Sequence, residues 1–179
     1  MSILHLDGTW EVIPGGYHNK LVEHADGNVL YDLSIAVDPN NGDIWRGHPW
    51  NTPSVWVTHA DDTVENFSTA NSDLISDEVW ALAVDQNSSL WVGTWEGLSM
   101  RHSNGEWESH LLGQHVVALA VAADGSIWAG TYSNGVWFKA ADSDSWQLHR
   151  AGDYGLHSAF TSDIEIDSTG NVWFAHGRY

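Results

Sequence analysis

Two acidic residues stand where the rest of the chain repeats small side chains. Four segments share one pattern of apolar and turn residues. In the last segment, Asp163 stands at the position that the other three segments fill with Ser34, Ala81 and Ala118. Glu165 stands at the position that they fill with Ala36, Ala83 and Ala120. Two carboxylates in a crowded interior are costly unless they are hydrated, paired or bound to a cation. The substitutions predict a site for a divalent cation. The alternative is that both carboxylates face water or pair with Arg178 or a histidine.

Two histidines occupy a second set of equivalent positions. The middle two segments end in Thr94 and Thr131, whereas the first and last end in His48 and His176. Imidazoles bind transition metals and other ligands, so these two would form half of a site if the fold brings them together. No H-x-x-x-H spacing supports a metal, and the alternative is that both are surface histidines on loops.

The loop that follows these positions is rich in aromatic residues. It carries Trp50, Trp95, Glu96, Tyr132, Asn134 and Arg178 in equivalent segments. Aromatic rings beside a few polar groups suit sugars and other small ligands. We therefore predict a ligand-binding face here, formed with His48 and His176. The alternative is that the loop aromatics only cover the strands beneath them.

Other polar residues recur at a fixed register. His110 and His149 each stand three residues after a tryptophan, and Asp38, Asp85 and Asp167 each follow an apolar run. Such recurrence indicates structure. We expect the histidines to pack and the aspartates to accept hydrogen bonds from turn amides.

Signatures of catalysis are missing from the sequence. There is no cysteine, so it has no disulfide, no thiolate nucleophile and no Cys-type zinc site. There is also neither a glycine-rich phosphate loop nor a G-x-S-x-G motif. An enzyme would have to assemble its site from scattered residues, so we favour a protein without catalytic activity.

A β-hairpin in the middle of the chain is the element that positions these residues. Val79–Val84 is an apolar run, residues 85–89 are a polar turn, and residues 90–92 begin a second apolar run. Short apolar runs bounded by turn residues are typical of buried strands. The hairpin recurs about every 40 residues, a period of repeat architectures, and each copy contains one tryptophan of the set Trp45, Trp91, Trp128 and Trp173.

The segment VWALAVDQNSSLWVGTWEGL at residues 79–98, led by NSDLISD at residues 71–77, resembles the two-component regulator propeller repeat. That resemblance covers most of the chain and is strongest in the second and third repeats. It implies a β-propeller, which this family uses in sensor domains, usually with more blades than this chain can supply. It implies little about the ligand, because propellers host unrelated functions.

We expect an all-β fold, a β-propeller with four blade-equivalents of four antiparallel strands. The predicted units are blades at 33–70, 77–110 and 115–150, a fourth blade split between 1–13 and 160–179, and an inserted hairpin at 14–32.

The N-terminal segment matches the outer strands of a blade. HLDGTWEV at residues 5–12 aligns with RHSNGEWES at residues 101–109, so Trp10 falls on Trp107. The first strands are therefore predicted to complete the sheet that ends the chain. Closure within one chain would give a four-bladed monomer, and exchange between two chains would give an eight-bladed two-fold dimer.

The formal net charge of −18 arises from 24 acidic side chains against six basic ones. Such a surface repels phosphate backbones, so we do not expect nucleic acid as a partner. No apolar stretch of about 18 residues is present, so we do not expect membrane insertion. MSILHLDG has neither the basic nor the apolar region of a signal peptide, which predicts the cytoplasm if Met1 is the native start.

These observations favour a non-catalytic ligand- or protein-binding β-propeller module of the sensor type. Its partner would be a small molecule, a peptide or a protein. The alternatives are a structural or assembly scaffold, and a hydrolase or lyase with its site in the channel of the ring.

Overall fold

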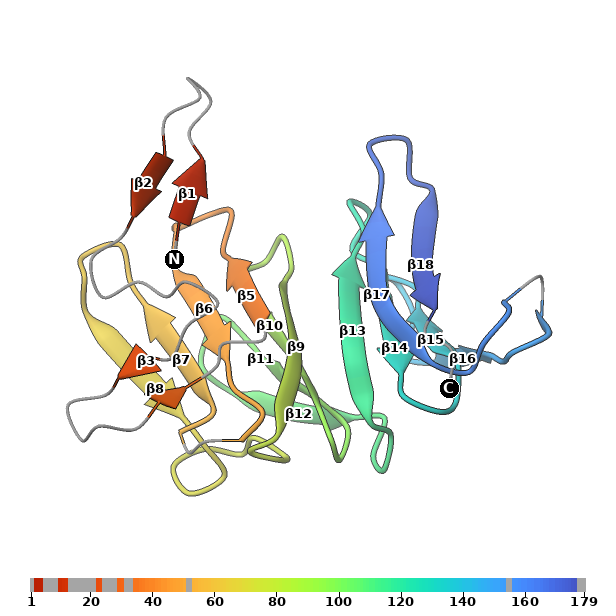
Figure 1. Ribbon diagram of the computed structural model, residues 1–179, viewed down its shortest axis with the longest axis horizontal. Helices are drawn as coiled ribbons and strands as arrows, with labels where there is room; N and C mark the ends of the chain where they lie inside the picture. Colours follow the sequence, from red (N-terminus) through yellow and green to blue (C-terminus); the bar gives the residue numbers. More distant parts are fainter. Residues whose placement is uncertain are drawn as a thin grey trace.

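The computed structural model consists of β-strands and connecting loops (Figure 1). It describes residues 34–50, 53–153 and 156–176 with their side chains, and the backbone alone of four short strands within the first 30 residues. No helix in this described part is long and apolar enough to cross a membrane.

Three four-stranded antiparallel sheets follow one another along the chain, each with its strands in sequential order. The first contains β5 (Ser34–Val37), β6 (Ile44–Gly47), β7 (Val55–Thr58) and β8 (Val64–Phe67). The second contains β9 (Val79–Val84), β10 (Leu90–Thr94), β11 (Leu98–Arg101) and β12 (Trp107–His110). The third contains β13 (Val116–Val121), β14 (Ile127–Thr131), β15 (Val136–Lys139) and β16 (Trp146–His149). These are the four-stranded blades that the repeat predicts.

Three further hairpins form two-stranded sheets. β17 (Thr161–Ile166) pairs with β18 (Val172–His176), and we call this pair the half blade. Near the N-terminus β1 (Ser2–Leu4) pairs with β2 (Trp10–Val12), and β3 (Val22–Glu23) pairs with β4 (Val29–Leu30). The β3–β4 pair lies within residues 14–32, where the sequence predicts an inserted hairpin.

The N-terminal hairpin does not join the half blade in the sheets that the structure describes. Among the described strands, β1 and β2 pair only with each other, and so do β17 and β18. Exchange of the hairpin between two chains remains a prediction.

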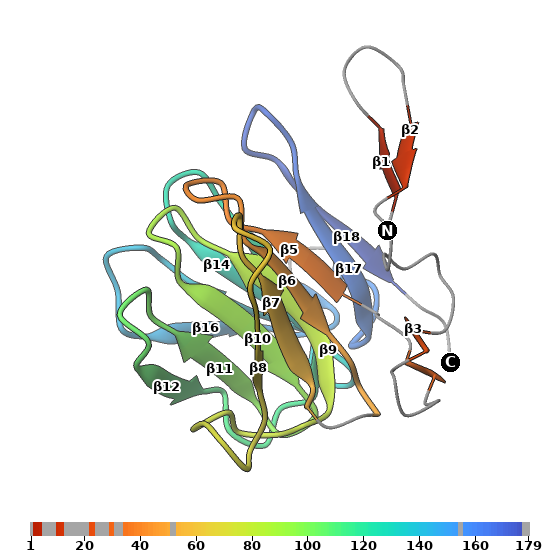
Figure 2. The ribbon, with the colours of Figure 1, turned by 90° about the vertical axis from the view of Figure 1, so that its left-hand side faces the viewer.

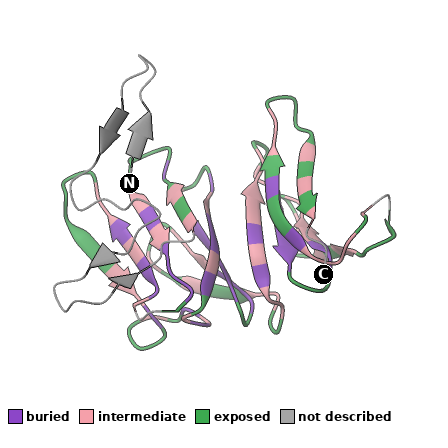
Figure 3. Cartoon of the chain, viewed as in Figure 1, coloured by how far each residue is buried: buried purple, intermediate pink, exposed green. Residues whose placement is uncertain are grey.

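Neighbouring sheets pack face to face through three hydrophobic clusters (Figure 2). The second-strand tryptophans Trp45 and Trp91 are only 5% and 4% exposed, because the next sheet covers each of them. Figure 3 shows the buried residues concentrated on the facing strands. Trp173 holds the equivalent position in the half blade but is 63% exposed. Trp173 is exposed because no further described sheet follows the half blade.

A glycine in the second strand allows each sheet to approach the next closely. A Cβ atom on Gly47 would lie 2.7 Å from Val79, and one on Gly93 would lie 2.9 Å from Val116. Gly130 repeats this approach against Thr161 in the half blade. These three glycines thus let the first residue of the next inner strand lie directly against the preceding blade.

An aromatic ring from the outer strand stacks on the second-strand tryptophan of each complete blade. The ring centroids are 6.0 Å apart in Trp45–Phe67, 5.4 Å in Trp91–His110 and 6.0 Å in Trp128–His149. The interplanar angles of the three pairs are 30°, 29° and 27°. His110 and His149 therefore pack as Phe67 does, which confirms the structural interpretation of these histidines.

The recurrent aspartates organise the turns after the inner strands, as predicted. Asp85 Oδ1 accepts hydrogen bonds from the amides of Asn87 at 2.8 Å and Ser89 at 2.9 Å. Asp167 accepts equivalent bonds and others from nearby side chains, with Thr169 the strongest influence, and these hold the pKa of Asp167 below its usual range. In each turn the aspartate side chain therefore accepts a hydrogen bond from the amide two residues later.

Candidate functional site

One end of the blades presents a continuous series of aromatic rings. These rings come from the loops that follow the second strands and from the residues at the start of the inner strands. We call this series the aromatic row, and its members are Trp50, Trp80, Trp95, His115, Tyr132 and Phe160.

Each ring of the row contacts at least one other ring of the row. From blade one to the half blade, the centroid distances are 5.8 Å for Trp50–Trp80, 5.1 Å for Trp80–His115, 5.1 Å for His115–Tyr132 and 5.4 Å for Tyr132–Phe160. Trp95 joins the row through His115 at 4.2 Å. The row therefore crosses every junction between neighbouring blades.

The row contains exposed rings and half-buried rings that contact them. Trp50 is 62% exposed, Trp95 51% and Tyr132 41%, which is unusual for rings of this size. His115 and Trp80 are half-buried beneath them. Because the half-buried rings contact the exposed ones, the exposed rings are already positioned in the protein without a ligand.

The buried part of the row is uncharged and poor in hydrogen bonds. Burial lowers the pKa of His115, so its imidazole is neutral at pH 7. Trp80 Nε1 and His115 Nε2 are buried and have no hydrogen-bond partner in the described part of the chain. A molecule resting on this surface would therefore interact mainly through stacking on rings.

Polar groups border the row in the same loops. Glu96 is exposed, and its carbonyl accepts a hydrogen bond of 2.8 Å from the amide of Gly113. Asn134 is also exposed and donates through Nδ2 to Gln114 Oε1 at 2.8 Å. These side chains can offer hydrogen bonds at the edge of the aromatic surface.

The two predicted histidines are not brought together within the chain. His48 follows β6 in blade one and His176 ends β18, with two complete blades between them. His48 is 3% exposed, so it is not the surface histidine considered as the alternative. Its amide donates to the carbonyl of Ser54 at 2.8 Å, which closes the loop after β6. The Nδ1 atom of His176 lies 3.4 Å from the carbonyl of Phe160, at the end of the row.

Asp163 and Glu165 lie on the outer face of the half blade. Both are exposed on β17, opposite Ala175 and Trp173 respectively. No group of three or more His, Asp or Glu side chains suited to a metal exists among the described residues. The two carboxylates are thus exposed on one strand, and a cation between them stays a prediction. Arg178 lies outside the described residues.

Sequence reasoning found the exposed members of the row but missed the supporting ones. Trp50, Trp95 and Tyr132 were predicted from their loops. His115 and Phe160 each stand directly before an inner strand, and this shared position is the signal that could have identified them. Trp80 lies inside a strand and shows no such signal.

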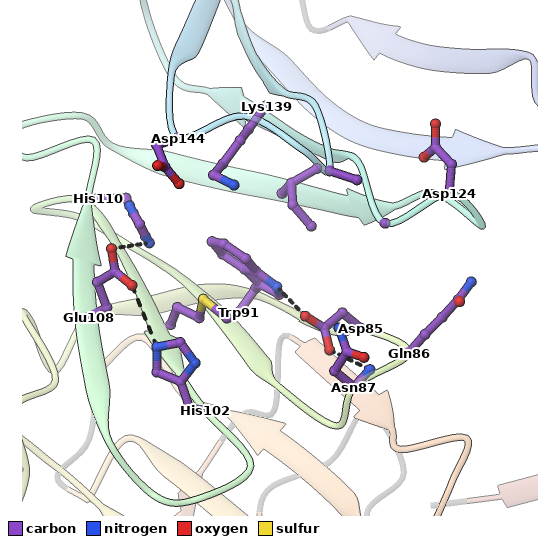
Figure 4. Close-up of a pocket in the computed structure, with 14 residues that line it drawn as sticks. Asp85, Gln86, Asn87, Trp91, His102, Glu108, His110, Asp124, Lys139 and Asp144 are labelled. Carbon is purple, nitrogen blue, oxygen red and sulfur yellow. Dashed lines mark hydrogen bonds and ion pairs between the residues drawn. The ribbon is translucent and has the colours of Figure 1, made fainter.

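A cavity of about 460 Å³ lies at the opposite end of blades two and three (Figure 4). Trp91 forms its floor, and Lys139 and Asp144 of blade three face it in Figure 4. Glu108 lies 3.5 Å from His102 Nε2 and 3.6 Å from His110 Nε2. Burial lowers the pKa of His110, although the Glu108 carboxylate opposes this effect. Because His110 repeats the packing of Phe67, we regard this cavity as part of the junction between blades and the aromatic row as the stronger candidate.

Comparison with known proteins agrees with this architecture. The family model described as two component regulator propeller matches residues 73–96. No curated protein matches the sequence.

Several solved structures share the fold. The extracellular domain of a hybrid two component system from B. thetaiotaomicron has a TM-score of 0.73 and 17% identity, over 97% of this chain and 23% of that one. PorZ of Porphyromonas gingivalis has a TM-score of 0.61 and 16% identity, over 94% and 27% of the two chains. Virginiamycin B lyase from Staphylococcus aureus has a TM-score of 0.66 and 14% identity, over 81% and 48%.

The chain thus spans less than half the length of each of these structures, and at such low identities the similarity shows the fold alone. The sequence match and the fold lead to the same conclusion: residues 73–96 carry a repeat of the two component regulator propeller type, within an all-β chain built of propeller blades.

Proposed function

We propose that this chain is a non-catalytic binding module that holds a neutral ligand against the aromatic row. The observation that carries the proposal is the unbroken contact of six rings across all the blade junctions, with three rings exposed. Exposed aromatic groups that are fixed in place lose little entropy when a ligand stacks on them.

Carbohydrates are the class of ligand that this surface fits best. The pyranose ring of a sugar has an apolar C–H face that stacks on Trp and Tyr, and its hydroxyl groups form hydrogen bonds at the edge. Glu96, Gln114 and Asn134 supply such hydrogen-bonding groups beside the row. The extent of the row over several blades favours an oligosaccharide over a single sugar.

The negative charge of the protein favours neutral over acidic carbohydrates. A net charge of −18 repels sulfated or uronic-acid chains, so we expect preference for neutral ligands.

A sensing role follows from the same proposal. The matched repeat is named for two component regulators, and one solved neighbour is the extracellular domain of such a system. We propose that ligand held on the row is the signal, and that it is reported to a partner protein or to another domain.

Binding to a panel of neutral and acidic oligosaccharides, by saturation-transfer NMR and calorimetry, tests this function. We expect binding of neutral chains such as cellohexaose, weakened roughly tenfold or more by Trp95→Ala or Tyr132→Ala. Leu112→Ala is the matched control, because Leu112 is 68% exposed and apolar but is not part of the row. Equal loss in all three variants, or binding of acidic chains only, would contradict the proposal.

A further inference from the structure

A cavity of about 700 Å³ lies between blade three and the half blade. Its lining is mainly apolar and aromatic, and includes Trp128, Val136, His149, Leu156, Val172 and Phe174. One edge of β18 borders it, and this edge pairs with no other described strand. An open strand edge beside an apolar cavity is a place where another strand can add.

At the other two blade junctions, a tryptophan from the outer hairpin of the next blade occupies the position equivalent to this cavity. Trp107 at the start of β12 packs edge-on against Phe67 of blade one, with centroids 5.8 Å apart. Trp146 at the start of β16 packs against Trp91 of blade two in the same way, at 6.3 Å. Each outer hairpin thus places a tryptophan over the stacked aromatic pair of the preceding blade. In the described part of the chain, no outer-strand tryptophan covers the Trp128–His149 pair, which lines the cavity.

The β1–β2 hairpin has the register of an outer hairpin. Leu4 pairs with Trp10 as Arg101 pairs with Trp107, with the same spacing along the chain. By register, Trp10 therefore corresponds to the tryptophan that covers the preceding aromatic pair. Within one chain, however, the described strands of this hairpin pair only with each other and not with β18.

The two ends of the arc expose surfaces that are buried at the internal junctions. Ile35 and Val37 on β5 are 45% and 57% exposed, whereas Leu82, the residue equivalent to Ile35, is 7% exposed. At the other end Trp173 is 63% exposed, whereas Trp91 is 4% exposed. Blade one thus exposes the inner-strand side of a blade junction, and the half blade exposes the tryptophan side, so the two surfaces are complementary.

We infer that two copies of this chain join by exchanging the β1–β2 hairpin. The hairpin of a second copy adds to the free edge of β18 and completes the half blade. The register of β10 with β11 places Leu4 of the second copy opposite Val172, Ile3 opposite Trp173 and Ser2 opposite Phe174. Trp173 then packs against Ile35 and Val37 of the second copy. A two-fold axis repeats the contact, which closes a ring of two arcs. This assembly is independent of the binding function proposed above.

Light scattering after size-exclusion chromatography of the full chain gives the first measurement. We expect twice the chain mass of 19.8 kDa. A species of single-chain mass at all concentrations overturns the exchange.

Engineered disulfides give the second measurement and locate the contact. Because the chain contains no cysteine, a Leu4→Cys chain and a Val172→Cys chain, coexpressed with different tags, can link only through the new residues. We expect a covalent dimer carrying both tags. Leu4→Cys with Phe174→Cys is the control, because its register is shifted by two residues, and it should link poorly.

Two results of the disulfide experiment would also overturn the inference. The first is an equal yield from the shifted pair. The second is a Leu4→Cys/Val172→Cys double variant that links only within one chain, which would show closure of the monomer.

Discussion

The ring centroids of Trp95 and His115 are 4.2 Å apart. Trp95 lies in the loop after β10 of blade two, and His115 directly precedes β13 of blade three. The contact is made across a junction between blades. The aromatic row is therefore a product of blade packing, because its rings come from different sheets that the interior clusters hold together. A ligand on the row would contact two or more blades at once.

The burial of the tryptophans predicts three different responses to truncation. Trp91→Ala should lower the free energy of unfolding by about 3–5 kcal/mol, because Trp91 packs between blades two and three. Trp95→Ala should cost less than about 1 kcal/mol, because its ring is largely exposed. Trp173→Ala should cost as little only at dilutions where the chain is monomeric, because the inferred dimer buries its ring. Urea denaturation of the three variants measures this, and similar losses for Trp91 and Trp95 would show that the row is part of the core.

The close approach at Gly93 predicts a strong effect of one methyl group. Gly93→Ala places a Cβ 2.9 Å from Val116 Cγ1 and 3.0 Å from its carbonyl, so the sheets must move apart. We expect a loss of about 1–3 kcal/mol in thermal or urea unfolding. Ala175→Gly is the control at the equivalent exposed position and should change stability much less. If Gly93→Ala were neutral, the junction would be looser than the structure shows.

The buried imidazole of His110 predicts a dependence of stability on pH. Burial lowers the pKa of His110 in the folded protein, so the unfolded chain binds that proton more readily. The stability is therefore fully present above the unfolded pKa of about 6.5 and falls as the pH drops below it. His110→Phe, which copies Phe67 of blade one, should flatten the melting temperature between pH 7 and 5. An unchanged pH profile in this variant would contradict the assignment.

The excess of acidic groups predicts stabilisation by salt. With 24 acidic and six basic side chains, repulsion within the folded chain opposes compactness. Sodium chloride at about 0.3 M should therefore raise the melting temperature by screening. Calcium chloride at the same ionic strength tests the cation proposed at Asp163 and Glu165. An additional rise that Asp163→Asn abolishes would support that site, and identical rises for the two salts would remove it.

The repeats made the strands predictable, because local pattern decides them. The apolar run from Val79 to Val84 and the turn aspartate Asp85 are determined by neighbours in sequence, and the structure places both as expected. The exposure of Trp95 was likewise implied by its loop position.

Features that depend on distant parts of the chain were not predictable in this way. Trp173 has the same register as Trp91, and only the missing sheet beyond it in the described chain leaves it exposed. The alternative to a ligand site at His48 was a surface histidine on a loop, yet His48 is 3% exposed and its amide donates a hydrogen bond to the carbonyl of Ser54. His115 became part of the candidate site only through rings contributed by other segments.

The central claim, that the aromatic row is the binding surface, is tested most directly by following tryptophan indole N–H signals in two-dimensional NMR. The signals are assigned through single Trp→Phe variants, and cellohexaose is titrated into the labelled protein. We expect the indole signals of Trp50 and Trp95 to shift with one common dissociation constant, while that of Trp91, in the opposite cavity, stays in place. Shifts confined to Trp91, with Trp50 and Trp95 unchanged, would contradict the account.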